Sequence, residues 1–191
     1  MSAELPGWER LRHGGLLLDS PRLRRVAAYA PAPLPGYLEM ELRRRAGALL
    51  DGAASHDGAA DVPEFVAFVL ERLCGFDAAS GNWQRGPQVG AEWGRRAVTS
   101  ETIKPRQLWR GANGGRLPVF LDGEARLGIG RGRRAASHVV QWLRGGEERL
   151  ALLTNGRQWR LVFAALDFDA WCEWDVDLWL EEGGLGSQVQ A

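Results

Sequence analysis

The chain is poor in the residue types that mark metal centres, disulfide frameworks and membrane spans. Its 191 residues include two cysteines, Cys74 and Cys172, and three histidines, His13, His56 and His138. The cysteines stand in apolar surroundings without C-x-x-C spacing, which indicates reduced core thiols in a cytoplasmic protein. The histidines lack the spacing of metal ligands, so we expect no metal site. We also expect no signal peptide and no membrane contact, because no apolar run approaches the ~20 residues of a membrane span.

Lysine is nearly absent as well. Lys104 is the single lysine, and every other cationic side chain is an arginine. Arginine forms bidentate contacts with phosphate, although an arginine-rich composition also follows from a GC-rich coding sequence. The net charge of zero is the sum of unlike segments: residues 85–144 carry twelve Arg and Lys against four Asp and Glu (+8), residues 145–191 three against nine (−6) and residues 1–84 nine against eleven (−2). The central segment is therefore the expected place for contact with nucleic acid.

The composition divides the chain into three parts. We expect a helical and proline-broken segment over residues 1–60, an α/β domain over 61–183 and a linker or cut end over 184–191. In the first part and at the start of the second, apolar spacing and helix start signals predict helices over 16–29, 37–50 and 61–74, with a small-residue linker over 51–60.

The second part has the pattern of a small central mixed sheet flanked by helices, an α/β (α+β) fold. Residues 76–96 read as a loop anchored by Trp83 and Trp93. Residues 102–110 have strand composition, but Pro105 restricts them to an edge or a bulge. The rest of the pattern predicts, in order, a strand over 117–121, a helix over 133–144, a strand over 150–153, a type I′ turn at Asn155-Gly156, a half-buried strand over 159–163 and a strand over 173–178 with Glu173, Asp175 and Asp177 on one face.

Carboxylates follow the strand over 117–121. Asp122 precedes Glu124-Ala125-Arg126, which stands where nucleases of the PD-(D/E)XK class have E-x-K. In those enzymes the carboxylates hold Mg²⁺ and the lysine positions or deprotonates the attacking water. Arg126 cannot act as a base, although it can bind phosphate. Pro105-Arg106 also stands where Pro-Asp would be expected. The motif is therefore degenerate, and Mg²⁺ would be a cofactor only of a working nuclease.

A glycine-rich basic stretch, GIGRGRR over 128–134, leads into the next helix. Its backbone amides, the helix N-terminus and Arg131, Arg133 and Arg134 are suited to hold phosphate, with Lys104 and Arg106 in support. The stretch matches neither a Walker A loop nor the G-x-G-x-x-G spacing. The alternatives to phosphate-backbone binding are a solvated basic turn and a nucleotide pocket.

The acidic strand near the end of the chain has a different interpretation. Three carboxylates on one face are more typical of a solvated or partner-facing edge than of a cation site. The tryptophans around them, over residues 171–179, are expected to be core and interface anchors, because no cationic residue interleaves them as in a base-stacking surface.

The stretch LALLTNGRQWRLV over 150–162, preceded by the strand that ends in Glu124-Ala125-Arg126 and by the helix with Gln141-Trp142, resembles the N-terminal domain of type IIG-like adenine-specific DNA methyltransferases, including those of the BREX and DISARM phage-defence systems. The resemblance covers about 75 residues. It implies a restriction-endonuclease-like fold, with Glu124 as a metal carboxylate, Arg126 in place of the catalytic lysine and Gln141 as a helix glutamine near the site.

The chain has no Asn-Pro-Pro-Tyr motif and no S-adenosylmethionine loop, so it is not expected to methylate DNA by itself. The leading hypothesis is a non-catalytic, nuclease-like domain that binds the backbone of double-stranded DNA and serves a methyltransferase domain or a defence-complex subunit. One alternative is a protein-interaction module that docks such a partner through the Trp-rich acidic edge over 167–182. The other is a Mg²⁺-dependent DNA nuclease.

Overall fold

The computed structural model describes residues 11–15, 17, 34–52, 62–76 and 81–180. These residues form a mixed α/β fold with a seven-stranded sheet, a two-stranded sheet and four α-helices. The elements are, in chain order, β1 (Arg12–Gly14), α2 (Gly36–Gly52), α3 (Val62–Phe68) continued by a π-helical turn (Val69–Leu73), β2 (Trp83–Arg85), β3 (Arg95–Arg96), β4 (Thr102–Ile103), β5 (Gln107–Arg110), β6 (Arg116–Leu121), α4 (Gly132–Arg144), β7 (Leu150–Thr154), β8 (Gln158–Ala164), β9 (Asp169–Asp175) and α5 (Val176–Leu180).

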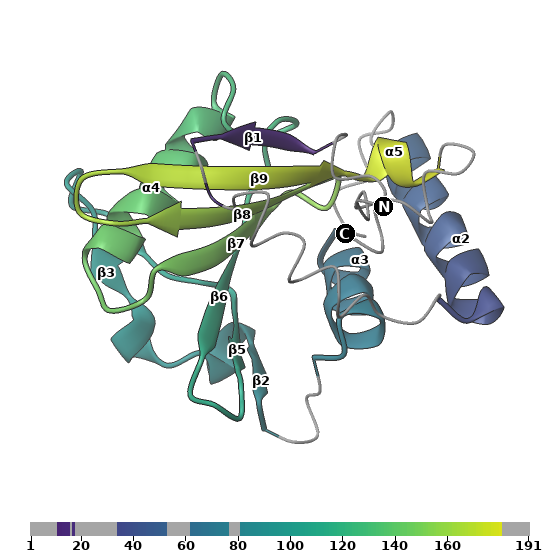
Figure 1. Ribbon diagram of the computed structural model, residues 1–191, viewed down its shortest axis with the longest axis horizontal. Coiled ribbons are helices and arrows are strands. Elements are labelled where there is room, and N and C mark those ends of the chain that lie inside the picture. The colour runs from purple at the N-terminus through teal and green to yellow at the C-terminus, as the bar shows by residue number, and fades with distance from the viewer. Residues whose placement is uncertain (1–10, 16, 18–33, 53–61, 77–80, 181–191) are drawn as a thin grey trace, which may run out of the picture.

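The large sheet has the strand order β1-β9-β8-β7-β6-β5-β2. Strands β6 and β7 pair in parallel, and α4 makes the crossover between them, as parallel neighbours require. All the other neighbouring pairs are antiparallel. Figure 1 shows β1 lying along the outer side of β9, so the described edges of this sheet are β1 and β2.

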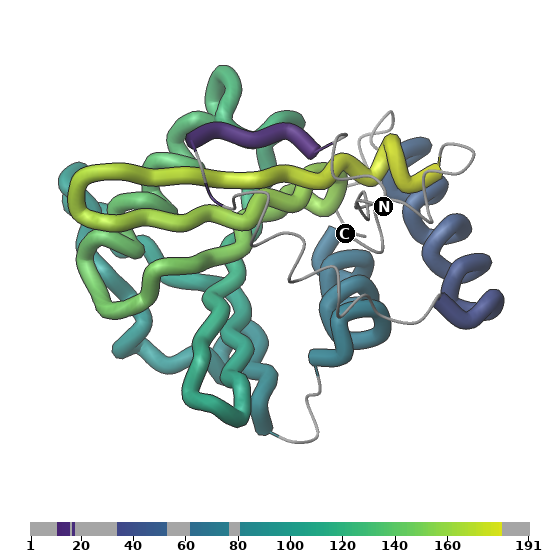
Figure 2. The backbone as a smooth tube through the Cα atoms, in the orientation of Figure 1, coloured from purple at the N-terminus to yellow at the C-terminus, as the bar shows by residue number. Residues whose placement is uncertain are grey.

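Helices cover both faces of the sheet. Figures 1 and 2 show α2, α3 and α5 together at one side and α4 with β3 at the other. Because side chains alternate along a strand, β7 sends Leu152 into the core under α2 and α3, and Ala151 and Leu153 into the core under α4. Both cores are therefore built on the same central strands, and α2 shares its core with residues that follow position 61.

The periodic helices and the central strands agree with the sequence pattern. Leu42 and Ala46 of α2 are fully buried, as their helical spacing predicts. The helix that begins at Val62 ends before Gly75, whose φ of 72° is favourable only for glycine. The helix predicted over 16–29 lies almost entirely outside the described residues, as do positions 53–60 of the linker and the end over 184–191.

Four local predictions are wrong. Residues 76–96 hold two short strands and two 3-10 turns in place of a plain loop. Strand β5 lies inside the sheet, and Pro105 is tolerated because it falls between β4 and β5. Asn155 has no positive φ, so the turn after β7 is not type I′. Cys74 is exposed, whereas Cys172 is buried in β9, which raises the pKa of its thiol to about 12.

The acidic strand differs most from its prediction. Strand β9 runs over Asp169–Asp175, and the residues after it form the short helix α5. Strand β8 is buried on both faces, including Gln158 and Arg160, which a half-buried strand would have left in solvent. Glu173 of β9 is 2% exposed and stands directly opposite Arg160. The predicted solvated acidic face is therefore partly an internal ion-pair face.

Candidate nucleic-acid interface

The loop of residues 122–131 joins β6 to α4 and has a defined shape. It begins where the Asp122 amide donates to the Thr154 carbonyl at 2.9 Å, which extends the β6–β7 pairing by one residue. It closes where the Gly128 amide donates to the Gly132 carbonyl at 3.1 Å. A Cβ atom on Gly132 would lie 2.0 Å from the Arg126 carbonyl oxygen, so only glycine allows the helix to start this close to the loop.

Strand β8 and the turn before it hold this loop through three side chains. Asn155 Nδ2 donates to the Glu124 carbonyl at 2.9 Å. The Leu127 amide donates to Gln158 Oε1 at 2.8 Å, and Arg160 Nη2 donates to the Leu127 carbonyl at 3.2 Å. The motif Asn155-Gly156-Arg157-Gln158-Trp159-Arg160 thus serves as a clamp on the loop, because both backbone groups of the buried Leu127 are satisfied from β8.

Arg160 is able to occupy this buried position because Glu173 neutralises it. Its Nε donates to Glu173 Oε2 at 2.8 Å, and its guanidinium lies 4.0 Å from the centre of the Trp171 ring. Arg12 of β1 reaches the other Glu173 oxygen at 2.6 Å. A buried charge is tolerated only when it is paired and hydrogen-bonded, which this network provides. The sequence did not predict this role. Polar residues at positions 158 and 160 of an otherwise apolar strand are nevertheless a signal that could have indicated it.

The predicted phosphate-binding residues are exposed and lie in three places: Arg131 in the clamped loop, Arg133 and Arg134 at the start of α4, and Lys104 and Arg106 between β4 and β5. Within the described residues, nine exposed cationic side chains form no ion pair with a carboxylate: Arg72, Arg96, Lys104, Arg106, Arg110, Arg126, Arg131, Arg133 and Arg149. Arg134 forms an ion pair with Glu101. The guanidinium groups of β8 and α2 are matched with carboxylates. Three of the unmatched cations, Arg126, Arg131 and Arg133, lie within eight positions of each other around the start of α4.

A groove of about 570 Å³ runs between β4 and the first two turns of α4. Phe120, Val139 and Leu153 contribute apolar walls, and Lys104 and Arg134 bring cationic groups from two separate elements. The structure thus brings together two of the residues predicted to bind phosphate, one from the segment after β4 and one from the helix. His138, one turn after Arg134, lines the same groove.

The degenerate nuclease residues are only partly brought together. Asp122 and Glu124 follow the end of β6, and Asp122 Oδ2 is buried without a hydrogen-bond partner. Burial, and then the charge of Glu124, raise the pKa of Asp122, while amide hydrogen bonds from Glu124 and Gly123 oppose them. Arg126 is exposed. Gln141 does not join this group, because its Oε1 accepts a hydrogen bond from the Val98 amide at 3.3 Å.

The described ranges contain no cluster of three or more His, Cys, Asp or Glu side chains placed to hold a metal ion. The carboxylates of the acidic strand have cationic partners in place of such a cluster: Asp175 pairs with Arg12 at 3.2 Å, and Asp177 pairs with Arg157. These two carboxylates of the predicted acidic edge are thus neutralised internally, whereas Asp167 of the same edge is exposed and forms no ion pair with a described residue.

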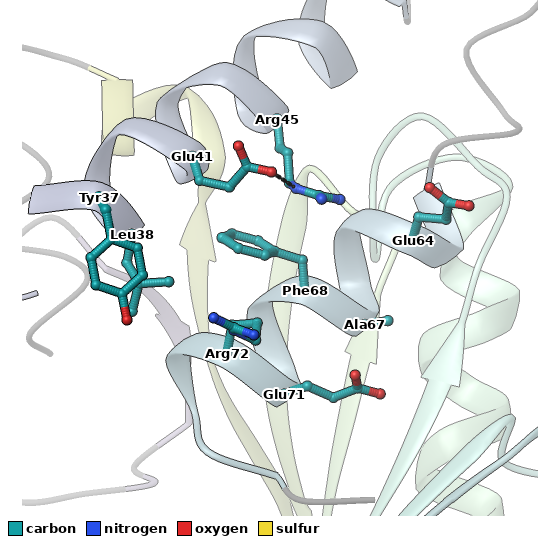
Figure 3. A pocket seen from close by; sticks show the side chains of 9 residues that line it. All are labelled: Tyr37, Leu38, Glu41, Arg45, Glu64, Ala67, Phe68, Glu71 and Arg72. Carbon is teal, nitrogen blue, oxygen red and sulfur yellow. Dashed lines mark hydrogen bonds and ion pairs between the residues drawn. The ribbon is translucent and has the colours of Figure 1, made fainter. Parts of the chain in front are cut away.

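A second hollow, of about 500 Å³, lies between α2 and α3. Figure 3 shows Phe68 between the Glu41–Arg45 pair of α2 and Arg72 of the π-helical turn. Hydrogen bonds from Arg44 and then Arg45 lower the pKa of Glu41 to about 2. The charges of α2 that border this hollow are thus matched with one another, unlike those near the start of α4.

The described residues define a mixed α/β domain with a groove at the start of α4 that Lys104 and Arg134 line. No family model, curated protein or solved structure matches the chain. None of the helices in the described ranges combines the length and the apolar character needed to cross a membrane.

Proposed function

We propose that this protein binds the phosphate backbone of double-stranded DNA through the loop of residues 122–131 and the cations beside it, without catalysis. In this proposal the domain is a restriction-endonuclease-like relative of the N-terminal domains of DNA methyltransferases. It serves a methyltransferase domain or a subunit of a restriction or phage-defence complex in the cytoplasm.

The observation that carries the proposal is that five exposed cations, in the loop of residues 122–131, at the start of α4 and between β4 and β5, form no ion pair with a described residue. Lys104, Arg106, Arg126, Arg131 and Arg133 keep their full charge available to an external anion. An exposed arginine can hold a phosphate by a bidentate contact, and each neutralised phosphate releases condensed counterions. Because the β8 clamp fixes the loop, little conformational entropy is lost when the loop meets DNA.

The residues at the nuclease-like position support binding better than catalysis. An arginine guanidinium cannot serve as a base, so the residue at position 126 cannot deprotonate water as a lysine can. Gln141 contacts Val98 and not the carboxylates. Asp122 and Glu124 provide two carboxylates after the end of β6, so the nuclease alternative can be tested. Cleavage of a DNA duplex in Mg²⁺ or Mn²⁺ that is lost in Glu124→Ala would contradict a non-catalytic domain.

The main experiment measures binding of a labelled DNA duplex by fluorescence anisotropy over a series of salt concentrations. Binding is expected to weaken steeply with salt and to depend little on sequence. The variant Arg126→Gln, Arg131→Gln, Arg133→Gln should reduce the slope of log affinity against log salt by about 2.7, since each phosphate contact contributes about 0.9.

The matched control replaces three arginines on the other side of the sheet, Arg43, Arg44 and Arg72, by glutamine. It makes the same change of net charge on α2 and the π-helical turn and should leave the salt slope almost unchanged. Absence of binding at low salt, or equal effects of the two triple variants, would contradict the proposal.

A second candidate function is docking of a protein partner at the β8–β9 hairpin. Leu166 and Phe168 are 80% and 51% exposed there, and exposed apolar side chains favour a protein contact. A complex with the methyltransferase subunit that survives high salt and is lost in Leu166→Ser, Phe168→Ser would support this function.

A further inference from the structure

The carboxylate of Glu101 lies at the groove between β4 and α4 and meets two residues of the helix. It forms an ion pair with Arg134, and its Oε2 lies 3.6 Å from His138 Nε2. Arg134 and His138 are four positions apart, so they lie on the same face of α4. Lys104, three positions after Glu101, lines the same groove. Three nitrogen-bearing side chains from two elements therefore border the groove that Glu101 occupies.

The interaction of Glu101 with Arg134 is open to competition. The two side chains are 48% and 64% exposed, and ion pairs at such positions contribute roughly 0–1 kcal/mol to stability. The hydrogen bond from Arg134 is the largest cause that lowers the pKa of Glu101, so this carboxylate stays ionised at neutral pH. An anion that also reaches Lys104 makes more contacts in the groove than Glu101 does.

The groove suits a phosphate group of DNA. Arg131 and Arg133, which form no ion pair with a described residue, lie three positions and one position before Arg134 at the start of α4, so a DNA strand that contacts them comes near the groove that Arg134 lines. A phosphodiester carries the same single negative charge as Glu101, so it can replace the carboxylate without leaving Arg134 unpaired.

We propose that Glu101 occupies a phosphate-binding position in this groove, and that a backbone phosphate of DNA displaces it to contact Arg134 and Lys104. Glu101 is thus a built-in competitor that holds the affinity of the interface below its full value. This inference rests on the proposed function and deepens it by assigning the groove as a phosphate site.

The test compares DNA binding of the wild-type protein and of Glu101→Gln over a salt series. Without the competing carboxylate, Arg134 is free to contribute one further phosphate contact. The affinity should rise by about five- to tenfold near 0.1 M salt and the salt slope should steepen by about 0.9. The matched control, Glu92→Gln, removes one exposed carboxylate from the same basic segment outside the groove and should change the slope little.

Two further measurements place the effect in the groove. Adding Arg134→Gln to Glu101→Gln should abolish the gain, because the gain requires the freed guanidinium. The imidazole NMR signals of His138 should shift when DNA is added to the wild-type protein or to Glu101→Gln. Inorganic phosphate at the same phosphate concentration should shift these signals little, because the duplex is the proposed ligand. Melting temperatures of the variants check that each is folded.

The outcomes separate this inference from the function on which it rests. If the wild-type protein binds DNA and Glu101→Gln behaves like Glu92→Gln, the phosphate site is wrong and the DNA interface stands. His138 signals that do not move on DNA binding would also overturn the site. If neither protein binds DNA at any salt concentration, the proposed function itself fails.

Discussion

Two groups of arginines in this protein have opposite surroundings. Around β8 and β9 they are paired: Arg160 and Arg12 share Glu173, and Arg157 meets Asp177. Around the start of α4, Arg126, Arg131 and Arg133 form no ion pair with any described residue. The side chain is the same in both groups, so composition does not separate them. The opposite residue does: Arg160 faces Glu173 at a fixed register in the β8–β9 pair, whereas no described carboxylate pairs with the three arginines at the start of α4.

The comparison shows which charges serve the fold and which are available to a partner. Arg160 and Glu173 are directly opposite in an antiparallel pair, where side chains of opposite charge stabilise each other. The ion pair also orients Arg160 toward the Leu127 carbonyl. The buried arginine thus helps to position the loop that carries the exposed arginines. Variants of the paired arginines should therefore change mainly stability, and variants of the unpaired arginines should change mainly DNA binding.

The largest effect is expected for Glu173→Ala. This variant leaves the Arg160 guanidinium buried without its carboxylate, which should lower the free energy of unfolding by about 3–5 kcal/mol. Urea unfolding followed by tryptophan fluorescence measures the loss. The double variant Arg160→Met, Glu173→Leu removes both charges and should be more stable than Glu173→Ala; a double variant as unstable as the single one would show that the pairing is not the cause.

A smaller loss is expected for Gln158→Ala. It leaves the buried amide of Leu127 without its acceptor, at a cost of about 1–3 kcal/mol. The affinity for DNA should fall with no change in the salt slope, because no charge is removed. The control is Gln141→Ala, whose partner amide at Val98 is exposed and can bind water. A steeper or shallower salt slope in Gln158→Ala would mean that this residue touches DNA itself.

The half-buried carboxylate of Asp122, whose Oδ2 atom is buried, predicts a dependence of stability on pH. Burial raises its pKa in the folded protein, so its contribution to stability is fully present below the unfolded pKa of about 3.9 and is lost as the pH rises through the folded value. Asp122→Asn should therefore increase stability at pH 7, by on the order of 1 kcal/mol, and have little effect at pH 3. Thermal unfolding at both pH values tests this, with the exposed Asp167→Asn as control. An equal effect at both values would exclude ionisation as the cause.

The smallest effect is expected for the exposed pair of Arg157 and Asp177. Their side chains are 44% and 40% exposed, so Arg157→Ala should cost less than about 1 kcal/mol. The difference should vanish in 1 M NaCl because salt screens exposed charges. A loss as large as that of Glu173→Ala would remove the distinction between buried and exposed pairs on which the comparison depends.

Helices and strands could be predicted from the sequence where the apolar residues keep one spacing along the whole element. The apolar spacing in α2 and in the helix from Val62 gave elements and buried faces that the structure confirms. The helix from Gly132 to Arg144 and the strand that ends at Thr154 were also predicted within one residue at each end. These elements are fixed by local pattern, so no knowledge of distant contacts was needed.

The rest depends on partners far apart in the chain. Arg160 looks like a solvent residue until its register with Glu173 is known. Alternation of acidic and apolar residues continues past Asp175, but the chain turns into α5, where Val176 and Trp179 are buried against the core with α2. The cations of the candidate site could be proposed from the sequence, because they fall in its most basic segment, residues 85–144. Its groove was missed because Glu101 and Arg134 meet only in the folded protein.

Strand β1 has a consequence for the order of folding. Its Arg12 contacts Asp175 across 163 positions of sequence, and the contact of Arg12 with Glu173 completes the network on Arg160. Closing so long a loop is entropically costly and slow, so this strand is expected to join after the central sheet has formed. Until then β9 is a bare edge with unpaired backbone groups. Substitutions at Arg12 should therefore speed unfolding while leaving the folding rate nearly unchanged.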